Sequence, residues 1–576
     1  MDNLEEHLRR QQEEIRTETR LQRESIESRW RQDLPDRVAS CRALGPLTIR
    51  AIENNGLIHF DPPREDIAIF RERDQLRLSR DDPEGDHLTV VFIGATRKGL
   101  TVYCERPEAV AAKPAPGWTL DEDFCDLSGF YLKAIDDLGT TAHGRDLVAP
   151  VLFAAQSPLL DLQTYDTAAD AMEATELDDS QSGAVATALA SSPFHLIQGP
   201  PGTGKTHTLA RLVEELVSWE HRILVTAFTH RAIHNALDEI HALLGGRCPV
   251  VKISQSIPGD RHPFDIFETW GDTRLADHTG PCVVGATPFA LWTKRLSGVH
   301  FDAIVLDETS QLTLPAAAMA MLRGDRWFFF GDHKQLPPVS LVHRDNPADA
   351  SVFARLARGS KPTTLNTTYR LNEPLTIWPS EIFYNGDLIA HERNASHRIA
   401  LKKPPARYPA LLAPDPSMVR IELDHEGCRS HSLEEADLAA DLIADLFDSG
   451  LTPAQAGVVV PFRAQASAIR RLLRGDRLAK HPEAPDIVID TVDRFQGQER
   501  EVIILSLACS DPAFIARLDA FLFLPPRLNV AVTRARTKVI LLHSTVLRNY
   551  ATTQAPCSES AAIFASLLEA ATLLPA

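Results

Sequence analysis

The sequence lacks several features that would place the protein in a narrow class. It has no uninterrupted apolar run of about 18 residues, so no membrane-spanning helix is expected. The N-terminus is charged and has no apolar segment typical of secretory signals, so we expect a cytoplasmic protein that needs no membrane. Positive charge is in deficit, because 60 Lys and Arg residues stand against 78 Asp and Glu residues, a net charge of −18. This balance argues against a surface that is basic throughout, but it leaves room for a single basic channel.

Cysteine spacing excludes a second group of proteins. None of the eight cysteines lies in a C-x-x-C pair. We therefore expect no zinc site, no iron–sulfur cluster and no disulfide framework. The remaining composition, with 44% apolar and 24% charged residues, is that of a globular protein with a large core. At roughly 100–200 residues per domain, the chain is long enough for three or four domains.

The first 150 residues differ in character from the rest. Residues 1–40 are mostly charged, with a thin apolar stripe, and predict a stalk helix that either packs by one narrow face or is solvated all round. Residues 41–116 contain short strand-like runs separated by turn signals and predict a small antiparallel β-barrel or meander. Residues 117–150 predict a second stalk helix, over 118–140, and a linker.

From residue 151 onward, short apolar strand patterns alternate with helical patterns. This alternation is typical of a parallel sheet covered by helices on both faces, and it predicts an α/β fold. Residues 151–361 carry a first series and residues 362–576 a second. In the second series, 433–449 predicts a helix that Ser432 caps at its start.

A glycine-rich segment lies between the strand predicted at 195–198 and the helix predicted after it. Lys205 is expected to reach the β- and γ-phosphates of a nucleotide, and Thr206 to coordinate Mg²⁺. Backbone N–H groups of such a loop, together with the N-terminus of the next helix, bind phosphate. ATP with Mg²⁺ is therefore the expected cofactor pair. The segment fits G-x-x-x-x-G-K-[ST] in full and reads Gly199, Pro200, Pro201, Gly202, Thr203, Gly204, Lys205 and Thr206.

Two carboxylates, Asp307 and Glu308, end the apolar run that begins at residue 303. At the tip of a strand beside a phosphate loop, Asp307 would hold the metal and Glu308 would polarise the attacking water. Alone, such charges are often only solvated strand ends. With a complete phosphate loop nearby, the catalytic interpretation is the better one. The two motifs predict an NTPase but do not say what its energy is used for.

Further segments decide that question. Residues 177–181, 307–311, 331–339, 367–374, 490–506 and 527–536 occur in the order of the motifs of superfamily 1 helicases. They resemble most the branch of the nonsense-decay helicase, senataxin and the immunoglobulin-μ-binding helicase. The resemblance covers about 150–545. It implies two RecA-like P-loop domains with parallel sheets, an N-terminal helical stalk and a small antiparallel β-barrel. It also implies an ATP-dependent helicase or translocase that moves 5′→3′ on single-stranded nucleic acid and unwinds DNA or RNA duplexes.

The resemblance assigns roles to single residues around the nucleotide. Gln181 matches the glutamine that recognises adenine, and Tyr369 matches the aromatic that stacks on the base. Gln335 matches the γ-phosphate sensor, and Glu499 matches a residue near the ribose. Arg370 and Arg534 match the arginines that reach the γ-phosphate from the second domain. A cation supplied by the second domain neutralises transition-state charge only when the cleft closes. Purely structural roles in a core, a turn or a cap stay open for Gln181, Tyr369, Gln335 and Arg534.

The family's nucleic-acid contacts match six residues: Thr229, His230, Asn235 and Thr287 in the first domain, and Arg463 and Thr491 in the second. Such contacts to the phosphodiester backbone carry no sequence information. Each of these residues is alternatively an ordinary polar loop residue. Six basic residues of the barrel could face nucleic acid, although a solvated surface is the favoured interpretation: Arg71, Arg73, Arg77, Arg80, Arg97 and Lys98.

Two other functions stay open on the sequence. One is a remodeller that strips proteins from nucleic acid without productive unwinding, since the same motor residues serve both activities. The other is an ATP-gated binding switch with slow turnover. The motifs do not choose between DNA and RNA, and they identify no protein partner.

Overall fold

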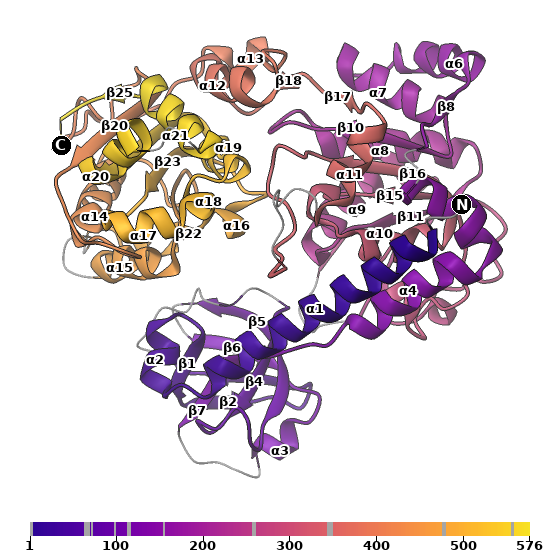
Figure 1. Cartoon of the computed structure of the whole chain (residues 1–576), viewed down its shortest axis with the longest axis horizontal. Helices are drawn as coiled ribbons and strands as arrows, with labels where there is room; N and C mark the ends of the chain where they lie inside the picture. The colour runs from indigo at the N-terminus through magenta and orange to yellow at the C-terminus, as the bar shows by residue number, and fades with distance from the viewer. Residues whose placement is uncertain are drawn as a thin grey trace. The chain divides into compact units, whose positions relative to one another are not determined.

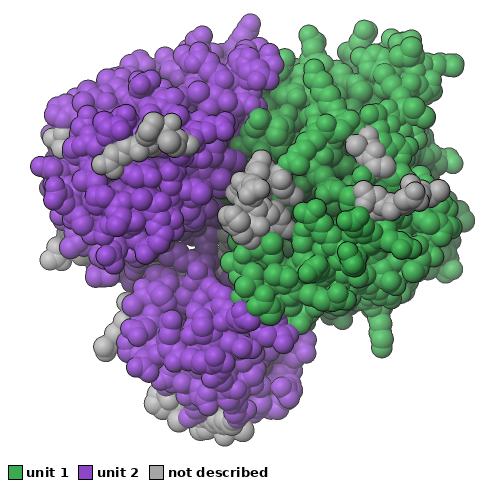
Figure 2. Space-filling model, viewed as in Figure 1, with its two compact units in different colours: residues 1–22, 126–368 green, residues 23–125, 369–576 purple. Residues whose placement is uncertain are grey.

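The chain divides into two compact units in the computed structural model. Unit 1 comprises residues 1–22 and 126–368, and unit 2 comprises residues 23–125 and 369–576 (Figure 2). The structure describes residues 4–62, 70, 73–96, 99–111, 117–153, 156–255, 261–342, 350–474, 478, 480–554 and 558–575. Within these ranges, no helix combines the length and the apolar character needed to cross a membrane.

Unit 1 is built on an eight-stranded sheet in the order β13-β12-β14-β11-β15-β16-β10-β17, with every pair of neighbours parallel (Figure 1). The strands are β10 (Phe194–Gln198), β11 (Arg222–Thr226), β12 (Val250–Ile253), β13 (Asp265–Phe267), β14 (Cys282–Gly285), β15 (Phe301–Leu306), β16 (Gly324–Gly331) and β17 (Thr363–Thr364). The parallel sheet expected from the alternating strand and helix patterns is thus confirmed. It places the carboxyl ends of all eight strands at one edge.

Helices cover both faces of this sheet because side chains alternate along each strand. On β11, Leu224 joins the apolar cluster of α4 (Ser128–Thr140), α10 (Leu314–Met321) and α11 (Val352–Gly359). Its neighbours Ile223 and Val225 join the opposite cluster, with α7 (Asp179–Ala190), α8 (Lys205–Ser218) and α9 (His230–Leu244). The long helix α1 (Leu4–Trp30) adds Ile15 to the first cluster. Its contact through one buried residue agrees with the thin apolar stripe of the sequence.

The start of the second series differs from the prediction. Thr363 and Thr364 were expected in the second domain, but β17 pairs with β10 through Ile197 and Gln198. Leu365 then packs into the core beside α7 and α8. A two-residue strand carries no pattern that tells which of two sheets it joins, so the sequence alone misplaced it.

Unit 2 contains a seven-stranded antiparallel sheet, called the N-terminal sheet, in the order β1-β7-β4-β5-β6-β3-β2. Its strands are β1 (Ala43–Leu47), β2 (Ile49–Ile52), β3 (Leu57–Phe60), β4 (Gln75–Ser79), β5 (Leu88–Thr96), β6 (Gly99–Tyr103) and β7 (Trp118–Glu122). All seven surround one apolar core that includes Phe60, Leu76 and Leu120. The antiparallel accessory fold is thus confirmed.

The prediction of a helix over 118–140 is wrong at its start. Trp118 and Leu120 alternate into the core of the N-terminal sheet, and Thr119 between them bonds to Ser79 across the strand pair. Gly117, with φ +98°, directly precedes β7 and has a backbone conformation that favours glycine. Helix α4 therefore begins only at Ser128.

The second parallel sheet lies in the C-terminal part of unit 2, in the order β22-β21-β23-β24-β20-β25. Its strands are β20 (Met418–Leu423), β21 (Ala456–Val460), β22 (Val488–Thr491), β23 (Arg500–Ser506), β24 (Ala535–Ser544) and β25 (Thr572–Leu573). The helix predicted at 433–449 is confirmed as α14 (Leu433–Asp448), and the Ser432 hydroxyl accepts a hydrogen bond from the N–H of Glu435. Strand β20 follows a segment, residues 404–416, that contains five prolines, and it was not predicted.

Candidate functional site

The phosphate loop joins the end of β10 to the start of α8, as the motif requires. Gly202 and Gly204 have φ of +76° and +74°, in the left-handed region that favours glycine. A Cβ at Gly204 would lie 2.4 Å from Nε2 of Gln181, so a larger residue is excluded there. Thr203 closes the loop from within, since its hydroxyl donates to the carbonyl of Pro200 at 2.8 Å. The two left-handed glycines and the hydroxyl of Thr203 therefore fix the shape of the loop.

Lys205, the first residue of α8, makes two ion pairs across the loop. Its Nζ lies 2.9 Å from Oδ1 of Asp307 and 2.8 Å from Oε1 of Glu308. Burial by itself would lower the pKa of Lys205, but the two carboxylates raise it above its usual value. The side chain is therefore a permanent cation, placed between the phosphate loop and the end of β15.

Asp307 and Glu308 differ in their surroundings although they are neighbours. Asp307 is buried, and burial raises its pKa although Lys205 opposes the shift. Glu308 is more open and has a φ of +51°, a left-handed conformation that costs a non-glycine residue about 1–2 kcal/mol. Its N–H donates to Oδ1 of Asp307 at 2.8 Å. This strained turn brings both carboxylates to the same lysine.

Asp332 is a buried residue of this region that the sequence interpretation missed. It follows β16, which pairs with β10, and its two carboxylate oxygens accept hydrogen bonds from Nε2 of Gln198 and Nε2 of Gln335, both at 2.9 Å. Gln335, expected to sense the γ-phosphate, thus sits in a turn whose geometry Asp332 fixes. A carboxylate directly after a buried strand beside a phosphate loop was the signal available in the sequence.

Gln181 lies in the first turn of α7 and is buried. Its Nε2 donates to the carbonyl of Thr203 at 3.0 Å, and its Oε1 accepts from the N–H of Asp178. The amide expected to recognise adenine therefore links the start of α7 to the phosphate loop. Thr368 also contacts this loop, through a hydrogen bond from its hydroxyl to the carbonyl of Pro201.

In unit 2, the carboxylate of Glu499 lies between two arginines. Arg370 Nε donates to Oε2 at 2.6 Å, and Arg536 binds Oε1. Burial would raise the pKa of Glu499, but the neighbouring arginines lower it below its usual value. Arg370 also donates to the carbonyl of Thr533 at 3.1 Å. The structure thus brings together Arg370 and Glu499, two residues that the sequence predicted separately.

Arg534 and Tyr369, two other expected nucleotide contacts, also lie in unit 2. Arg534 is 2% exposed, and its Nε donates to the carbonyl of Val530 near the end of α19 (Pro525–Val532). Carbonyls at a helix C-terminus stabilise a cation. The ring of Tyr369 lies 4.7 Å from the ring of His391, and the guanidinium carbon of Arg393 lies 4.7 Å from its centre.

The four nucleic-acid residues expected in unit 1 follow two neighbouring strands. Thr229 comes after β11 and caps α9, because its hydroxyl accepts from the N–H of Ala232. His230 and the exposed Asn235 lie on α9, and Thr287 follows β14. Since β11 pairs with β14 and β15, these residues lie at the same carboxyl edge of the sheet as Asp307.

In unit 2, Arg463 starts α15 (Arg463–Leu473) after β21, and Thr491 ends β22. Val460 and Thr491 are register partners, so the two segments are adjacent. Arg463 Nη1 donates to the carbonyl of Cys41 at 2.9 Å and lies 3.4 Å from Oε1 of Glu122. The expected track residue thus also contacts the N-terminal sheet, which local sequence could not indicate.

The basic residues of the N-terminal sheet fall into two groups. Arg71, Arg97 and Lys98 lie outside the described residues. Of the others, Arg77 donates to Asp123 at 2.6 Å and lies over Trp30, and Arg80 lies over Trp118. Arg77 and Arg80 therefore take part in packing, whereas no role is assigned to Arg73.

The expected absence of zinc stays a prediction. In the part of the chain that the structure describes, His425, Cys428 and Glu434 bring one ligand atom each within 4.8 Å of one another. Both ring nitrogens of His425 already have partners, the hydroxyl of Ser510 and the carboxylate of Glu435. His425 therefore belongs to a buried hydrogen-bond network with Ser510 and Glu435, whereas Cys428 is partly exposed and Glu434 is exposed.

Comparison with known families gives two matches along the chain. A family model described as an AAA domain matches residues 176–256 and 282–342, and a second, also described as an AAA domain, matches residues 348–545. The first spans the phosphate loop and Asp307, and the second spans Arg370 and Arg534.

Curated relatives share roughly two thirds of the chain. The DNA replication ATP-dependent helicase/nuclease dna2 of Schizosaccharomyces pombe is 27% identical over 64% of this chain and 28% of its own length. The DNA-binding protein SMUBP-2 of Mesocricetus auratus is 29% identical over 66% of this chain and 44% of its own. A regulator of nonsense transcripts 1 homolog of Neurospora crassa is 28% identical over 64% and 37%. The chain thus spans less than half the length of these three relatives.

Proposed function

The chain belongs to the superfamily 1 helicases of the branch of the nonsense-decay helicase, senataxin and the immunoglobulin-μ-binding helicase, and we propose that it is an ATP-dependent helicase or translocase on single-stranded nucleic acid. The observation that carries the proposal is the ion pairing of Lys205 with Asp307 and Glu308 beside a complete phosphate loop. A lysine at the loop and two carboxylates at the end of β15 are the parts that phosphoryl transfer from ATP to water needs.

In the proposed reaction, the phosphate loop and Lys205 hold the β- and γ-phosphates of ATP. Glu308 polarises a water whose oxygen bonds to the γ-phosphorus while the bond to the bridging oxygen breaks, which leaves ADP and phosphate. Thr206 and Asp307 offer hydroxyl and carboxylate oxygens, the ligands Mg²⁺ prefers, and that ion when bound neutralises charge on the phosphates.

The remaining nucleotide residues act around this centre. Gln335, oriented by Asp332, senses the γ-phosphate, and Gln181 holds the loop and recognises the adenine that Tyr369 stacks on. Arg370 and Arg534 stabilise transition-state charge from unit 2, with Arg370 oriented by Glu499 near the ribose. Hydrolysis is then coupled to the opening and closing of the two units.

The proposed track runs along the carboxyl edges of the two parallel sheets. Thr229, His230, Asn235 and Thr287 line it in unit 1, and Arg463 and Thr491 line it in unit 2. Hydroxyl, amide and imidazole groups grip phosphate weakly enough to release it, as a translocating motor requires. The proposal has three finer parts. DNA is included as a track because two relatives are named for DNA replication and DNA binding. The 5′→3′ polarity is implied by the family, and we place the protein in the cytoplasm.

The decisive experiment measures ATP turnover with and without single-stranded RNA or DNA, at several Mg²⁺ concentrations. Lys205→Ala is compared with Lys361→Ala, which removes an exposed lysine of the same unit outside the loop. Stimulation by a polymer that Lys205→Ala abolishes and Lys361→Ala retains supports the proposal and identifies the preferred track. Turnover that neither polymer raises, and that Lys205→Ala does not lower, contradicts it.

Duplex substrates with a 5′ or a 3′ overhang separate the variants of the proposal. Strand separation from the 5′ overhang alone supports a 5′→3′ helicase, whereas separation from the 3′ overhang alone contradicts the polarity. Displacement of streptavidin from a biotinylated strand without duplex separation identifies a remodeller instead.

A further inference from the structure

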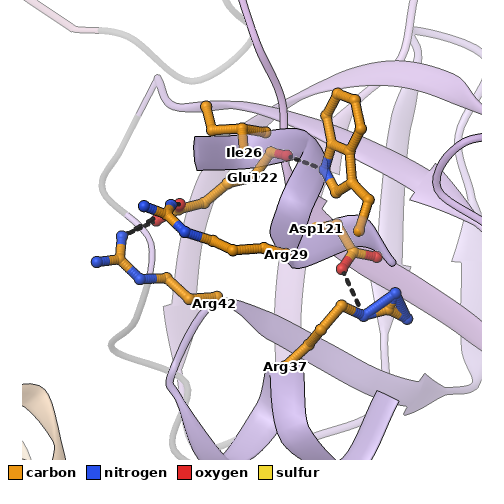
Figure 3. A pocket seen from close by; sticks show the side chains of 7 residues that line it. Ile26, Arg29, Arg37, Arg42, Asp121 and Glu122 are labelled. Carbon is orange, nitrogen blue, oxygen red and sulfur yellow. Dashed lines mark hydrogen bonds and ion pairs between the residues drawn. The ribbon is translucent and has the colours of Figure 1, made fainter. Parts of the chain in front are cut away.

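One carboxylate in unit 2 holds three arginines. Glu122, the last residue of β7, accepts hydrogen bonds from Nη1 of Arg29 at 2.7 Å and from Nη1 of Arg42 at 2.9 Å. Arg463 lies 3.4 Å from the same group. Figure 3 shows Arg29, from the end of α1, and Arg42 converging on Glu122. Three parts of unit 2 therefore meet there: the stalk helix, the N-terminal sheet and the second parallel sheet.

This cluster is unbalanced in charge. Three guanidiniums against one carboxylate leave a surplus of two positive charges in a chain whose net charge is −18. Burial would raise the pKa of Glu122, but Arg42, Arg463 and Arg29 lower it. Burial and neighbouring arginines in turn lower the pKa of Arg29 and of Arg463. The arginines repel one another, so a second anion would relieve the cluster.

The cluster is also accessible. The side chains of Arg29, Arg42 and Arg463 are 27%, 35% and 26% exposed to solvent, and that of Glu122 is 23% exposed. Partly exposed guanidiniums are the usual ligands of phosphate, which they bind through paired N–H groups.

The position of the cluster relates it to the proposed track. Arg463 and Thr491, two expected contacts, follow the neighbouring strands β21 and β22. Arg494 continues this edge beside Asp490, at 3.7 Å, and its charge acts on Arg463. The line of cations at the carboxyl edge of the second sheet thus extends through Arg463 to Arg42 and Arg29.

We propose that Arg29, Arg42 and Arg463 form a binding site for a backbone phosphate of single-stranded nucleic acid, and that Glu122 competes with that phosphate for the three guanidiniums. This inference rests on the proposed function, because it extends the track onto the stalk and the N-terminal sheet. A phosphate that enters draws the arginines from Glu122 and thereby loosens the joint between α1, β7 and α15. Nucleic acid is then sensed at this joint.

The test measures binding of a fluorescent single-stranded oligonucleotide by the full chain over a range of salt concentrations. Glu122→Gln removes the competing charge and keeps the shape, so we expect affinity to rise by about threefold or more at low salt. The matched control is Glu84→Gln, since Glu84 pairs with the exposed Arg31 at the end of the same stalk helix, at 3.2 Å. This control tests whether any lost negative charge tightens binding.

A second pair of variants keeps the test informative if Glu122→Gln unfolds. Arg29→Gln and Arg42→Gln should each weaken binding roughly tenfold and reduce the salt slope by about 0.7, the contribution of one phosphate contact on a single strand. Arg31→Gln is their control and should change affinity by less than about twofold. Thermal unfolding of every variant checks that the fold is intact.

The outcomes separate this inference from the proposed function. If the wild type binds no single strand, both are overturned. If it binds, but Glu122→Gln matches Glu84→Gln or weakens binding, or if Arg29→Gln and Arg42→Gln match Arg31→Gln, only this site is rejected. Tighter binding by Glu122→Gln alone, with a lower salt slope in the two arginine variants, supports it.

Discussion

The charged clusters of the two units have opposite balances. In unit 1, a single lysine, Lys205, lies between two carboxylates. In unit 2, single carboxylates lie among arginines, with Glu499 between Arg370 and Arg536 and Glu122 among three others. A site with surplus carboxylate suits a metal-bound nucleotide, whereas a site with surplus guanidinium suits bare phosphate oxygens. In the proposed reaction, unit 1 supplies the groups for catalysis and unit 2 supplies cations that stabilise charge.

We expect the largest loss of ATP turnover from a change to a carboxylate of unit 1. Glu308→Gln keeps the shape of the side chain but removes the carboxylate that is proposed to polarise water. We expect stimulated ATP turnover to fall by about 10²–10⁴-fold while ATP binding persists. Filter binding of radiolabelled ATP, beside turnover, checks this expectation. Loss of binding together with turnover would show that Glu308 shapes the loop rather than the chemistry.

Arg534→Ala tests the surplus cation of unit 2. Its guanidinium donates to the carbonyls of Val530 and Gln498, and we propose that it stabilises charge on the γ-phosphate. Turnover should fall by about 10³-fold, with little change in the affinity of the nucleotide for unit 1. Arg548→Ala, at a partly exposed arginine of the same unit, is the control. Equal effects of the two variants would contradict a catalytic role for Arg534.

Glu499→Gln sharpens the contrast within unit 2. Arg370 would lose the carboxylate that orients it, so turnover should fall roughly tenfold, since one charged hydrogen bond contributes about 1.5–3 kcal/mol. Affinity for single strands should not rise. Glu122→Gln should do the reverse, with tighter binding of the strand as its main effect. If the two variants behaved alike, the arginine clusters would have no separate roles.

The sequence predicted the nucleotide cluster better than the arginine clusters for a physical reason. The phosphate loop is contiguous, and Lys205 meets Glu308, 103 residues away, because parallel strands bring their carboxyl ends to one edge. Arg29 and Arg463 lie 93 and 341 residues from Glu122 in the sequence, and no motif indicates that either contacts it. The same lack of local signal explains why β17 was assigned to the wrong sheet and β7 was taken for helix.

The family resemblance predicted some residues that local sequence patterns could not. It selected Arg370 and Glu499, 129 residues apart, and the structure joins them in an ion pair. It gave no partner for Arg463, because that contact involves the N-terminal sheet, whose sequence has no motif of its own. Short contiguous patterns therefore sufficed to predict the motifs. The pairing of side chains that are far apart in the sequence could be seen only in the folded structure.

The smallest expected effect concerns stability rather than turnover or binding. It comes from His195, a buried titratable group that has no charged partner in its hydrogen bonds. His195 lies on β10, the strand that leads to the phosphate loop, and its ring nitrogens contact the hydroxyls of Ser191 and Thr363. Burial lowers the pKa of His195 to about 4. Since histidine in the unfolded chain titrates near pH 6.5, the unfolded state binds more protons between about pH 6.5 and 4. The free energy of unfolding should therefore fall as pH falls through this window.

His195→Gln should remove this contribution, which amounts to about 1–3 kcal/mol between pH 7 and pH 4. Urea unfolding of unit 1 at both pH values, for the variant and the wild type, measures the difference. His300→Gln, at an exposed histidine of the same unit, should leave the wild-type pH dependence in place. A wild-type dependence in His195→Gln would mean that the ion pairs of Lys205, and not a buried neutral ring, set the acid limit of unit 1. That limit would then be governed by Asp307, which is proposed to bind the metal, and by Glu308, which is proposed to polarise water.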